Sequence, residues 1–374
     1  MASLQTRGEI ILSKAGIKVN GNKPWDIQVH NPGLYSRVFS HGTLGLGESY
    51  MDGDWDCKAL DQFFYKILKS SLEKELKISI PLIKDFIKAR IINLQSSKRA
   101  FQIGEKHYDT GNDLYSLMLD KRLVYTCAYW DNGAKNLDKA QEDKLDLVCK
   151  KLRLKKGQKI LDIGCGWGSF AKFAAEKYKV KVIGITVSKE QAELAKKLCK
   201  GLDVEIRLQD YRDIDKNEKF DHIVSLGMFE HVGIKNYKRY MQIVAKHLKD
   251  DGLFLLHTIG SNTSGKVGDP WISKYIFPNS KLPSQKQIAE SVEGIFIEED
   301  SHNLSTNYDK TLMAWHKNIS TNWNKLDKNK YNKRFRRMWE YYLLSSAGIF
   351  RARKIQVWQK VYSKGIDRGY KSVR

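Results

Sequence analysis

The sequence has few cysteines, and none lies in a pattern that suits a zinc site or a redox motif. The five cysteines form no CxxC pair, show no Cys/His spacing typical of zinc and are odd in number. We therefore expect a reduced, cytosolic protein without a structural metal. The sequence also lacks a signal peptide's apolar stretch and any run of about 20 apolar residues. If the protein meets a membrane, we expect it to lie on the surface without spanning it.

Acidic residues are much fewer than basic ones. Lys and Arg total 65 against 43 Asp and Glu, which gives a net charge of +22 at pH 7. This surplus predicts attraction to a polyanion, either nucleic acid or an anionic membrane surface, although it is also compatible with a merely solubilising surface. The length of 374 residues, 41% of them hydrophobic, favours one large domain and a smaller one.

The first hundred residues change character twice. Residues 1–57 are rich in turn signals, among them Asn31-Pro32-Gly33, Gly42, Gly45-Leu46-Gly47 and Asp52-Gly53. Residues 58–95 carry apolar side chains at helical spacing interspersed with Lys and Arg, which predicts a basic amphipathic helical pair. That pair either packs against the main domain or docks on a membrane surface. Residues 95–99 are interpreted as a linker.

From about residue 155 the pattern alternates between strand and helix. Such alternation predicts a mostly parallel sheet with helices on both faces, an α/β fold. The predicted strands lie at 159–163, 180–186, 204–208, 222–226 and 253–257, and the predicted helices follow the first strand through 174 and cover 188–200 and 237–248.

Glycines follow the first predicted strand. Asp162-Ile163-Gly164-Cys165-Gly166-Trp167-Gly168 closes this strand and opens a helix, where a ligand needs close access to the backbone. A dinucleotide fingerprint would require glycine at 169, where Ser169 stands, and an acid at the end of the second strand, where there is none. The motif favours S-adenosylmethionine over a nicotinamide cofactor, with Thr186 or Gln191 replacing the usual ribose-binding acid.

Several uncommon stretches carry a more specific signal. They are residues 44–53, 107–109, 125–130, 161–168, 228–233, 255–260 and 312–315. In content and order they resemble the cyclopropane fatty acid synthases and, more distantly, the mycolic acid cyclopropane synthases, and the resemblance runs essentially end to end.

The resemblance implies a fold and an activity. The fold is a class I S-adenosylmethionine-dependent methyltransferase (Rossmann-like) domain with a small helical N-terminal domain. Residues 1–95 would be a lipid- or membrane-associated domain and residues 100–374 the catalytic domain. The implied enzyme transfers a methylene group from S-adenosylmethionine to the cis double bond of unsaturated phospholipid acyl chains. We expect a homodimer, cytoplasmic and peripherally associated with the inner face of the membrane, that does not act on nucleic acid.

The resemblance also assigns site residues. The family's S-adenosylmethionine positions are matched by Tyr125, Thr126, Gly164, Cys165, Gly166, Thr186, Gln191, Tyr211 and Arg212, with Cys165 contributing its backbone. The family's bicarbonate positions are matched by Cys127, Glu230, His257, Ile259 and Tyr308. Family members often carry a cysteine where this chain has Ser346, which argues against a nucleophilic cysteine there.

Bicarbonate suits the expected chemistry. An alkene has no proton to lose before it attacks the methyl group, so the cofactor must be held close and in line. The resulting carbocation requires a dry site and a base that removes a proton from the transferred methyl. We expect Tyr308, His257 and the Ile259 backbone to orient bicarbonate, while Glu230 accepts its O–H.

Other interpretations remain open. His257 and Cys127, taken locally, resemble a core histidine and a small buried hydrophobe. The basic run at 333–337 suits either a solvated helix face or a phosphate-facing patch. A nucleic-acid methyltransferase would explain the charge, but the proline motif common after the fourth strand is missing at 227–230. A catalytically dead membrane-binding module is a third possibility, against which the intact glycine turn argues.

Overall fold

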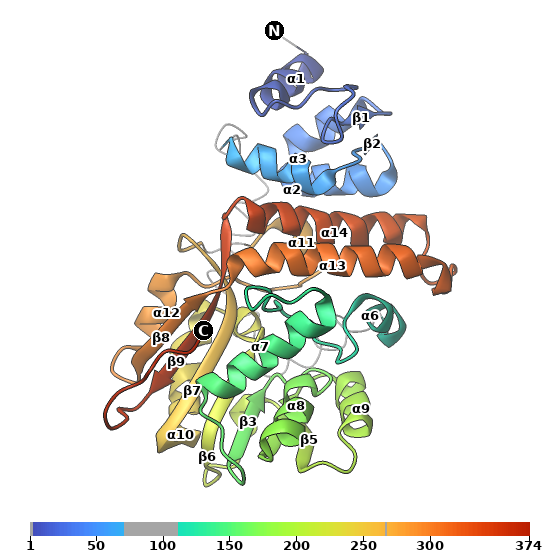
Figure 1. The fold of residues 1–374 in the computed structure, drawn as a ribbon. Coiled ribbons are helices and arrows are strands. Elements are labelled where there is room, and N and C mark those ends of the chain that lie inside the picture. The colour runs from blue at the N-terminus through green and yellow to red at the C-terminus, as the bar shows by residue number, and fades with distance from the viewer. Residues whose placement is uncertain (1–2, 71–110, 266–267) are drawn as a thin grey trace. The chain divides into compact units, whose positions relative to one another are not determined.

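The computed structural model describes residues 3–70, 111–265 and 268–374, which group into two compact units (Figure 1). The helical unit comprises Met1–Ile92, Lys266–Pro278 and Tyr308–Ile355, and the sheet unit comprises Asn93–Gly265, Asn279–Asn307 and Gln356–Arg374. The predicted division into 1–95 and 100–374 stays a prediction. Its boundary, the second helix of the predicted pair, the linker at 95–99 and the motif at 107–109 lie outside the described residues.

A seven-stranded sheet forms the centre of the sheet unit, in the order β5-β4-β3-β6-β7-β9-β8 (Figure 1). Strands β3 to β7 pair in parallel, and β8 pairs antiparallel with β9. The five predicted strands are confirmed, although β7 is longer than predicted, and β8 and β9 were not predicted. The bounds are β3 Lys159–Ile163, β4 Lys181–Thr186, β5 Val204–Leu208, β6 Phe220–Leu226, β7 Leu248–Ser261, β8 Ile297–Asn303 and β9 Ile355–Ser363.

Neighbouring residues of β3 face opposite sides of this sheet. Leu161 and Ile163 belong to a core shared with α10 (Tyr237–His247) and α12 (Gln285–Val292), whereas Ile160 belongs to a core shared with α7 (Leu137–Lys151) and α8 (Ser169–Tyr178). Both faces are therefore covered, which is why β3 buries apolar side chains on both of its faces. The predicted helices at 188–200 and 237–248 are confirmed as α9 (Lys189–Leu198) and α10.

The strand order reverses between β3 and β6. Ligands of open parallel sheets bind at the carboxyl ends of the strands beside such a reversal. Short helices follow β5 and β6 at this edge, η2 (Tyr211–Asp213), η3 (Phe229–His231) and η4 (Ile234–Asn236), and α6 (Asn112–Met118) precedes α7 in the chain. The loops after β3, β4, β5 and β6 are therefore the expected position of a ligand site.

The helical unit gathers three stretches of chain. Its interior contains a cluster of aromatic rings, in which Tyr341 lies 5.5 Å from Tyr50 and 4.6 Å from Trp271 between ring centroids. The elements are α1 Leu4–Lys14, β1 Gln28–Val29, α2 Gly33–Asp52, β2 Trp55–Asp56, α3 Leu60–Lys69, α11 Pro270–Tyr275, α13 Ser305–Asn322 (whose first residues belong to the sheet unit), η5 Trp323–Lys325 and α14 Lys333–Arg351.

The interpretation of residues 33–52 as turns was wrong, because this stretch is helix α2. Its glycines serve close packing. A Cβ on Gly45 would lie 2.1 Å from the Arg37 carbonyl oxygen, and one on Gly47 would lie 2.3 Å from the Trp271 ring. Gly42 has φ 58° and kinks the helix, and Gly53, with φ 86°, ends it. In this stretch, Gly45 and Gly47 allow close packing inside the helix, and Gly53 ends it.

The basic run at 333–337 opens α14, and its arginines pair with carboxylates. Arg334 lies 2.8 Å from Asp52, and Arg337 lies 2.7 Å from Asp56. Arg336 pairs with Glu340 on the same helix at 3.1 Å. These pairs neutralise much of the charge, which weakens the interpretation as a phosphate-facing patch.

Across residues 3–70, 111–265 and 268–374, the structure contains no helix that is both long enough and apolar enough to cross a bilayer.

Candidate functional site

The glycine turn after β3 has the geometry that the sequence predicts. Gly164, Gly166 and Gly168 have φ of 81°, 54° and 79°, in the left-handed region that favours glycine. The N–H groups of Gly164 and Cys165 both donate to the Ile185 carbonyl, at 2.9 and 3.0 Å, which fixes the turn against β4. A Cβ on Gly164 would lie 2.8 Å from Met228. The turn is therefore fixed against β4, and glycine at 164 makes room for Met228.

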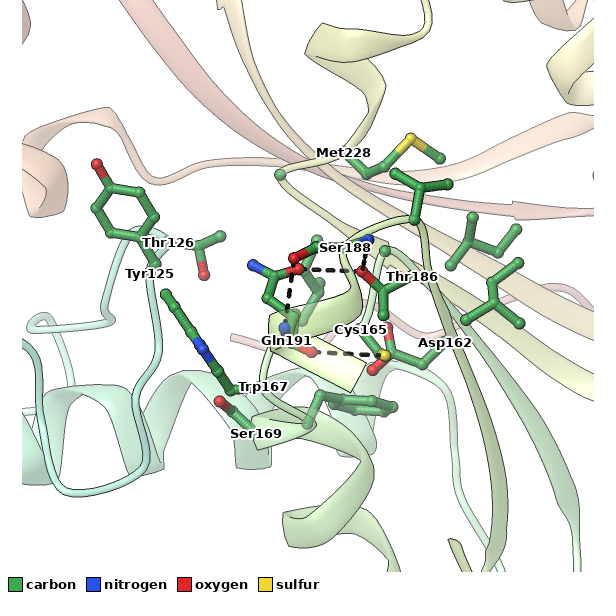
Figure 2. A pocket seen from close by; sticks show the side chains of 18 of the residues that line it. Tyr125, Thr126, Asp162, Cys165, Trp167, Ser169, Thr186, Ser188, Gln191 and Met228 are labelled. Atoms are coloured by element: carbon green, nitrogen blue, oxygen red, sulfur yellow. Dashed lines mark hydrogen bonds between the residues drawn. The ribbon is translucent and has the colours of Figure 1, made fainter. Parts of the chain in front are cut away.

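A pocket opens above this turn, and the segment before α7 and the ends of β3, β4, β5 and β6 line it (Figure 2). The structure brings all nine predicted cofactor residues to this one pocket. They are Tyr125, Thr126, Gly164, Cys165, Gly166, Thr186, Gln191, Tyr211 and Arg212. Their role in holding a cofactor stays a prediction. Residues that sequence analysis did not select also line the pocket, among them Lys144, Asp162, Met228 and His231.

Thr186 ends β4 and Gln191 lies in the first turn of α9, where the sequence predicts a replacement for the usual ribose-binding acid. The buried Thr186 hydroxyl donates to Gln191 Oε1 at 3.0 Å and accepts from the Ser188 N–H at 3.2 Å (Figure 2). Ser188 caps α9 by accepting from the Gln191 N–H. Because Gln191 Oε1 already accepts from Thr186, Gln191 can offer a ligand the N–H groups of its side-chain amide. This network places polar neutral groups where hydroxyls of a ligand can bind.

Asp210 and Arg212 form a bidentate ion pair in the lining of the pocket. Arg212 Nε and Nη2 donate to the two Asp210 oxygens, each at 2.7 Å, and the Arg212 N–H donates to Oδ1 at 2.9 Å. The Asp210 carboxylate raises the pKa of Arg212. Burial raises the pKa of the neighbouring Tyr211 to about 12, so its phenol is neutral and able to donate a hydrogen bond.

A buried lysine supports the Thr126 segment. Lys144 lies on α7 with no exposed surface, and its Nζ donates to Thr126 Oγ1 at 2.8 Å. Gln141, one turn earlier on α7, donates to the Thr126 carbonyl at 2.9 Å. Burial lowers the pKa of Lys144 to about 8, against the opposing influence of Asp120 and, less strongly, Asp162. Burial likewise raises the pKa of Asp162 to about 7.

Glu230, in the short helix η3 that follows β6, contacts one of the other predicted anion-site residues directly. Its Oε1 accepts from the Ile259 N–H at 2.6 Å, and its buried Oε2 has no hydrogen-bond partner within the described part of the chain. Burial raises the pKa of Glu230 to about 7, although the Ile259 N–H opposes the shift. The Ile259 N–H, which we expected to orient bicarbonate, is therefore occupied by Glu230 in this structure.

His257 lies two residues before Ile259 on β7 and is buried. Gln359 Nε2 donates to His257 Nδ1 at 3.3 Å, so the ring proton of the neutral imidazole is on Nε2. Burial holds the pKa of His257 well below its usual range, and the charges of Lys144 and Lys151 act in the same direction. His257 is thus a neutral imidazole whose Nε2–H can serve as a donor.

The two remaining predicted anion-site residues, Cys127 and Tyr308, belong to different units. Cys127 is buried, and its thiol lies 3.3 Å from the Ala128 carbonyl and 3.8 Å from the Leu304 carbonyl. Tyr308 belongs to the helical unit, where its ring lies 4.6 Å from that of Phe350. A common anion site for Cys127, Glu230, His257, Ile259 and Tyr308 stays a prediction.

Lys144 is the main pocket residue that sequence analysis missed. A signal for it existed in α7, where Leu137, Ala140, Gln141, Lys144 and Leu145 form a helical stripe that is buried throughout. A lysine within such a stripe is a buried charge, and buried charges are rare unless they are paired or functional.

Comparison with known proteins gives a consistent result. The family model described as mycolic acid cyclopropane synthetase matches residues 95–360. The chain is 52% identical to a cyclopropane-fatty-acyl-phospholipid synthase of Escherichia coli (strain K12) over 364 residues, which cover 97% of this chain and 94% of that protein.

Solved structures agree. A cyclopropane synthase from Mycobacterium tuberculosis superposes with a TM-score of 0.66 at 30% identity, covering 71% of this chain and 98% of that one. A mycolic acid cyclopropane synthase complexed with SAH and CTAB gives a TM-score of 0.64 at 32% identity, covering 70% and 97%. These likenesses confirm the predicted class I methyltransferase fold of the sheet unit.

Proposed function

The chain belongs to the mycolic acid cyclopropane synthetase family. On this basis we propose that it transfers a methylene group from S-adenosylmethionine to the cis double bond of an unsaturated phospholipid acyl chain. We further propose that a bound bicarbonate ion is the base. The observation that carries this proposal is the 52% identity, over 97% of the chain, to a cyclopropane-fatty-acyl-phospholipid synthase. The product would be a cyclopropane fatty acid within the phospholipid.

The pocket residues fit the cofactor. When bound, S-adenosylmethionine supplies an electrophilic methyl carbon. Glycine at 164 lets Met228 pack against the turn, since a Cβ there would meet Met228 at 2.8 Å. The Thr186 and Gln191 pair offers neutral polar groups for the ribose hydroxyls, and Tyr125 and Thr126 also line the pocket. Buried apolar lining such as Phe170 and Ile185 excludes water from the reacting carbons.

The buried groups of the Glu230 region support the bicarbonate half of the proposal. Neutral His257 donates from Nε2 and adds no positive charge that would lower the basicity of the anion. Binding requires Glu230 to share or release the Ile259 N–H, after which Oε2, which has no described partner, accepts the bicarbonate O–H. The oxygens of the anion are then free to take the proton from the transferred methyl as the ring closes.

A direct test incubates the purified protein with methyl-labelled S-adenosylmethionine and, in parallel, with vesicles of mono-unsaturated phospholipid or with RNA. Label in the lipid fraction supports the proposal. Label in RNA would support a nucleic-acid methyltransferase, and label in neither would support an inactive membrane-binding module.

Removal of dissolved carbon dioxide tests the base separately. In degassed buffer we expect lipid labelling to fall sharply and to recover when bicarbonate is added. Labelling that is the same in both buffers would refute bicarbonate as the base, while leaving the methylene transfer intact.

We also propose that the protein works as a cytoplasmic homodimer on the inner face of the membrane. The net charge of +22 supports attraction to anionic head groups. Co-sedimentation with anionic vesicles should then weaken steeply as salt rises from about 0.05 to 0.5 M, because the Debye length shrinks. Light scattering of the free protein would test the dimer.

A further inference from the structure

Lys144 is a buried cation whose hydrogen-bond partner belongs to the cofactor pocket. Its side chain is fully buried and lines that pocket, and its described hydrogen bond is the 2.8 Å contact from Nζ to Thr126 Oγ1. Among the described residues it forms no ion pair, whereas the pocket's other cation, Arg212, is neutralised by Asp210 at 2.7 Å. A buried ammonium without a paired carboxylate costs free energy, so its presence at a binding site calls for a ligand.

The chemistry of this contact fixes the direction of the Thr126 hydroxyl. An ammonium group only donates hydrogen bonds, so Thr126 Oγ1 must accept from Lys144. The hydroxyl hydrogen then points away from Lys144. The Thr126 methyl lies close to Gly227 on another side, where an added Cβ would lie 2.8 Å from Cγ2. The Thr126 carbonyl is held by Gln141 at 2.9 Å. Thr126 therefore has a fixed rotamer and a polarised O–H donor.

A donor that is polarised by a cation recognises an anion. We propose that Lys144 is a positioning residue that acts through the Thr126 hydroxyl to bind the carboxylate of the cofactor's amino-acid portion. The buried ammonium supplies the compensating positive charge, and Thr126 makes the hydrogen bond. The inference rests on the proposed function, since it requires an S-adenosyl cofactor in this pocket.

The test compares two ligands that differ in one group. S-adenosylhomocysteine carries the carboxylate, and its decarboxylated amine analogue does not. Calorimetry should show that Lys144→Met weakens binding of S-adenosylhomocysteine by about 10- to 100-fold, the range for a hydrogen bond to a charged group, while the analogue changes by less than about threefold. Methionine keeps the length of the side chain and introduces no buried charge, so the fold should persist.

Thr126→Val supplies a second variant that removes only the hydroxyl. It should show the same selective loss. Because Lys144 acts through Thr126, the double variant should lose little more than either single one. Lys151→Met is the matched control, since Lys151 is equally buried on the same helix but bonds to His302 at 3.1 Å and does not line the pocket. It should bind both ligands like the wild type.

The outcomes separate the inference from the proposed function. If Lys144→Met or Thr126→Val weakens the binding of both ligands equally, or of neither, Lys144 is merely structural and the inference is overturned. If the wild-type protein fails to bind S-adenosylhomocysteine at all, the proposed function falls, and the inference falls with it. Selective loss in both variants supports the inference.

Discussion

The cofactor pocket and the Glu230 region both lie in the sheet unit, but they satisfy their polar groups differently. In the pocket, Arg212 closes on Asp210, and Thr186 bonds to Gln191, although Asp162 Oδ2 has no described partner. In the Glu230 region, Glu230 Oε2 and Gln359 Oε1 are both buried without a described partner. The pocket is thus largely preorganised for binding, whereas the Glu230 region holds unused acceptors beside a carboxyl with a raised pKa. Changes in the pocket should lower affinity, and changes around Glu230 should lower turnover.

The largest expected effect is on turnover in Glu230→Gln. The amide has nearly the same shape but cannot act as the anionic acceptor that points bicarbonate at the substrate. We expect labelling of phospholipid to fall by roughly 100- to 1,000-fold, the scale of a lost acid–base group. The dissociation constant for S-adenosylhomocysteine, measured by calorimetry, should stay within about twofold.

The exposed Glu290 provides the control for that variant, and Glu290→Gln should keep full turnover. If Glu230→Gln weakened cofactor binding as much as turnover, the two regions would not be separable in the way described above.

A smaller effect, on affinity, is expected at the glycine turn. Gly164 and Gly157 have nearly equal φ, 81° and 84°, but an added Cβ meets Met228 at 2.8 Å in the first case and nothing within 4 Å in the second. Alanine at Gly157 should lower the free energy of unfolding by about 1 kcal/mol, and alanine at Gly164 should lower it further because Met228 must also shift. Only Gly164→Ala should also weaken the binding of S-adenosylhomocysteine, by about tenfold or more. Equal affinity in both variants would show that the turn does not need its open backbone.

The pH dependence of stability probes the Glu230 region without substrate. Its pKa rises on folding from 4.5 to about 7, so the folded protein binds more protons than the unfolded chain between these values. The contribution of Glu230 to stability is therefore present below about pH 4.5 and lost as the pH rises through 7. Relative to wild type, Glu230→Gln should gain on the order of 2–3 kcal/mol in unfolding free energy between pH 4.5 and 8. Urea unfolding at both pH values measures this, and a difference that does not change with pH would contradict it.

The smallest effect is expected at Lys179, which belongs to neither region. Lys179 is exposed and caps the end of α8 with φ 57°, a conformation that glycine adopts without strain. Lys179→Gly should raise the free energy of unfolding by up to about 1 kcal/mol and leave cofactor affinity and turnover unchanged. Thermal unfolding and calorimetry would measure both, and any loss of affinity would show coupling between this helix end and the pocket.

Local patterns in the sequence predicted the glycine turn and the strand ends that border the pocket. The turn at Gly164 and the residues after β4 and β5 lie at the ends of strands that the apolar pattern predicts, and parallel strands bring those ends to one edge. The family resemblance added Tyr125 and Thr126, which no strand pattern places there.

Long-range packing explains what the sequence did not predict. Lys144 enters the pocket because α7 covers one face of the sheet. The stripe in α7 marks Lys144 as a buried charge but does not indicate which strand ends it faces. Gly45 and Gly47 were taken as turn residues, although they permit close contacts with Arg37 and Trp271. Strands β8 and β9 pair with each other although the whole of α13 and α14 lies between them in the chain, a separation that a local pattern does not reveal.

The most direct measurement follows the transferred methyl group with deuterium. The protein is given S-adenosylmethionine with a fully deuterated methyl group and vesicles of mono-unsaturated phospholipid, and the acyl chains are analysed by mass spectrometry. Our account predicts chains that have lost the double bond and retain two of the three deuterium atoms, since ring closure removes one. Chains that retain all three, or chains that are unaltered although the protein binds the cofactor and bicarbonate is present, would contradict it.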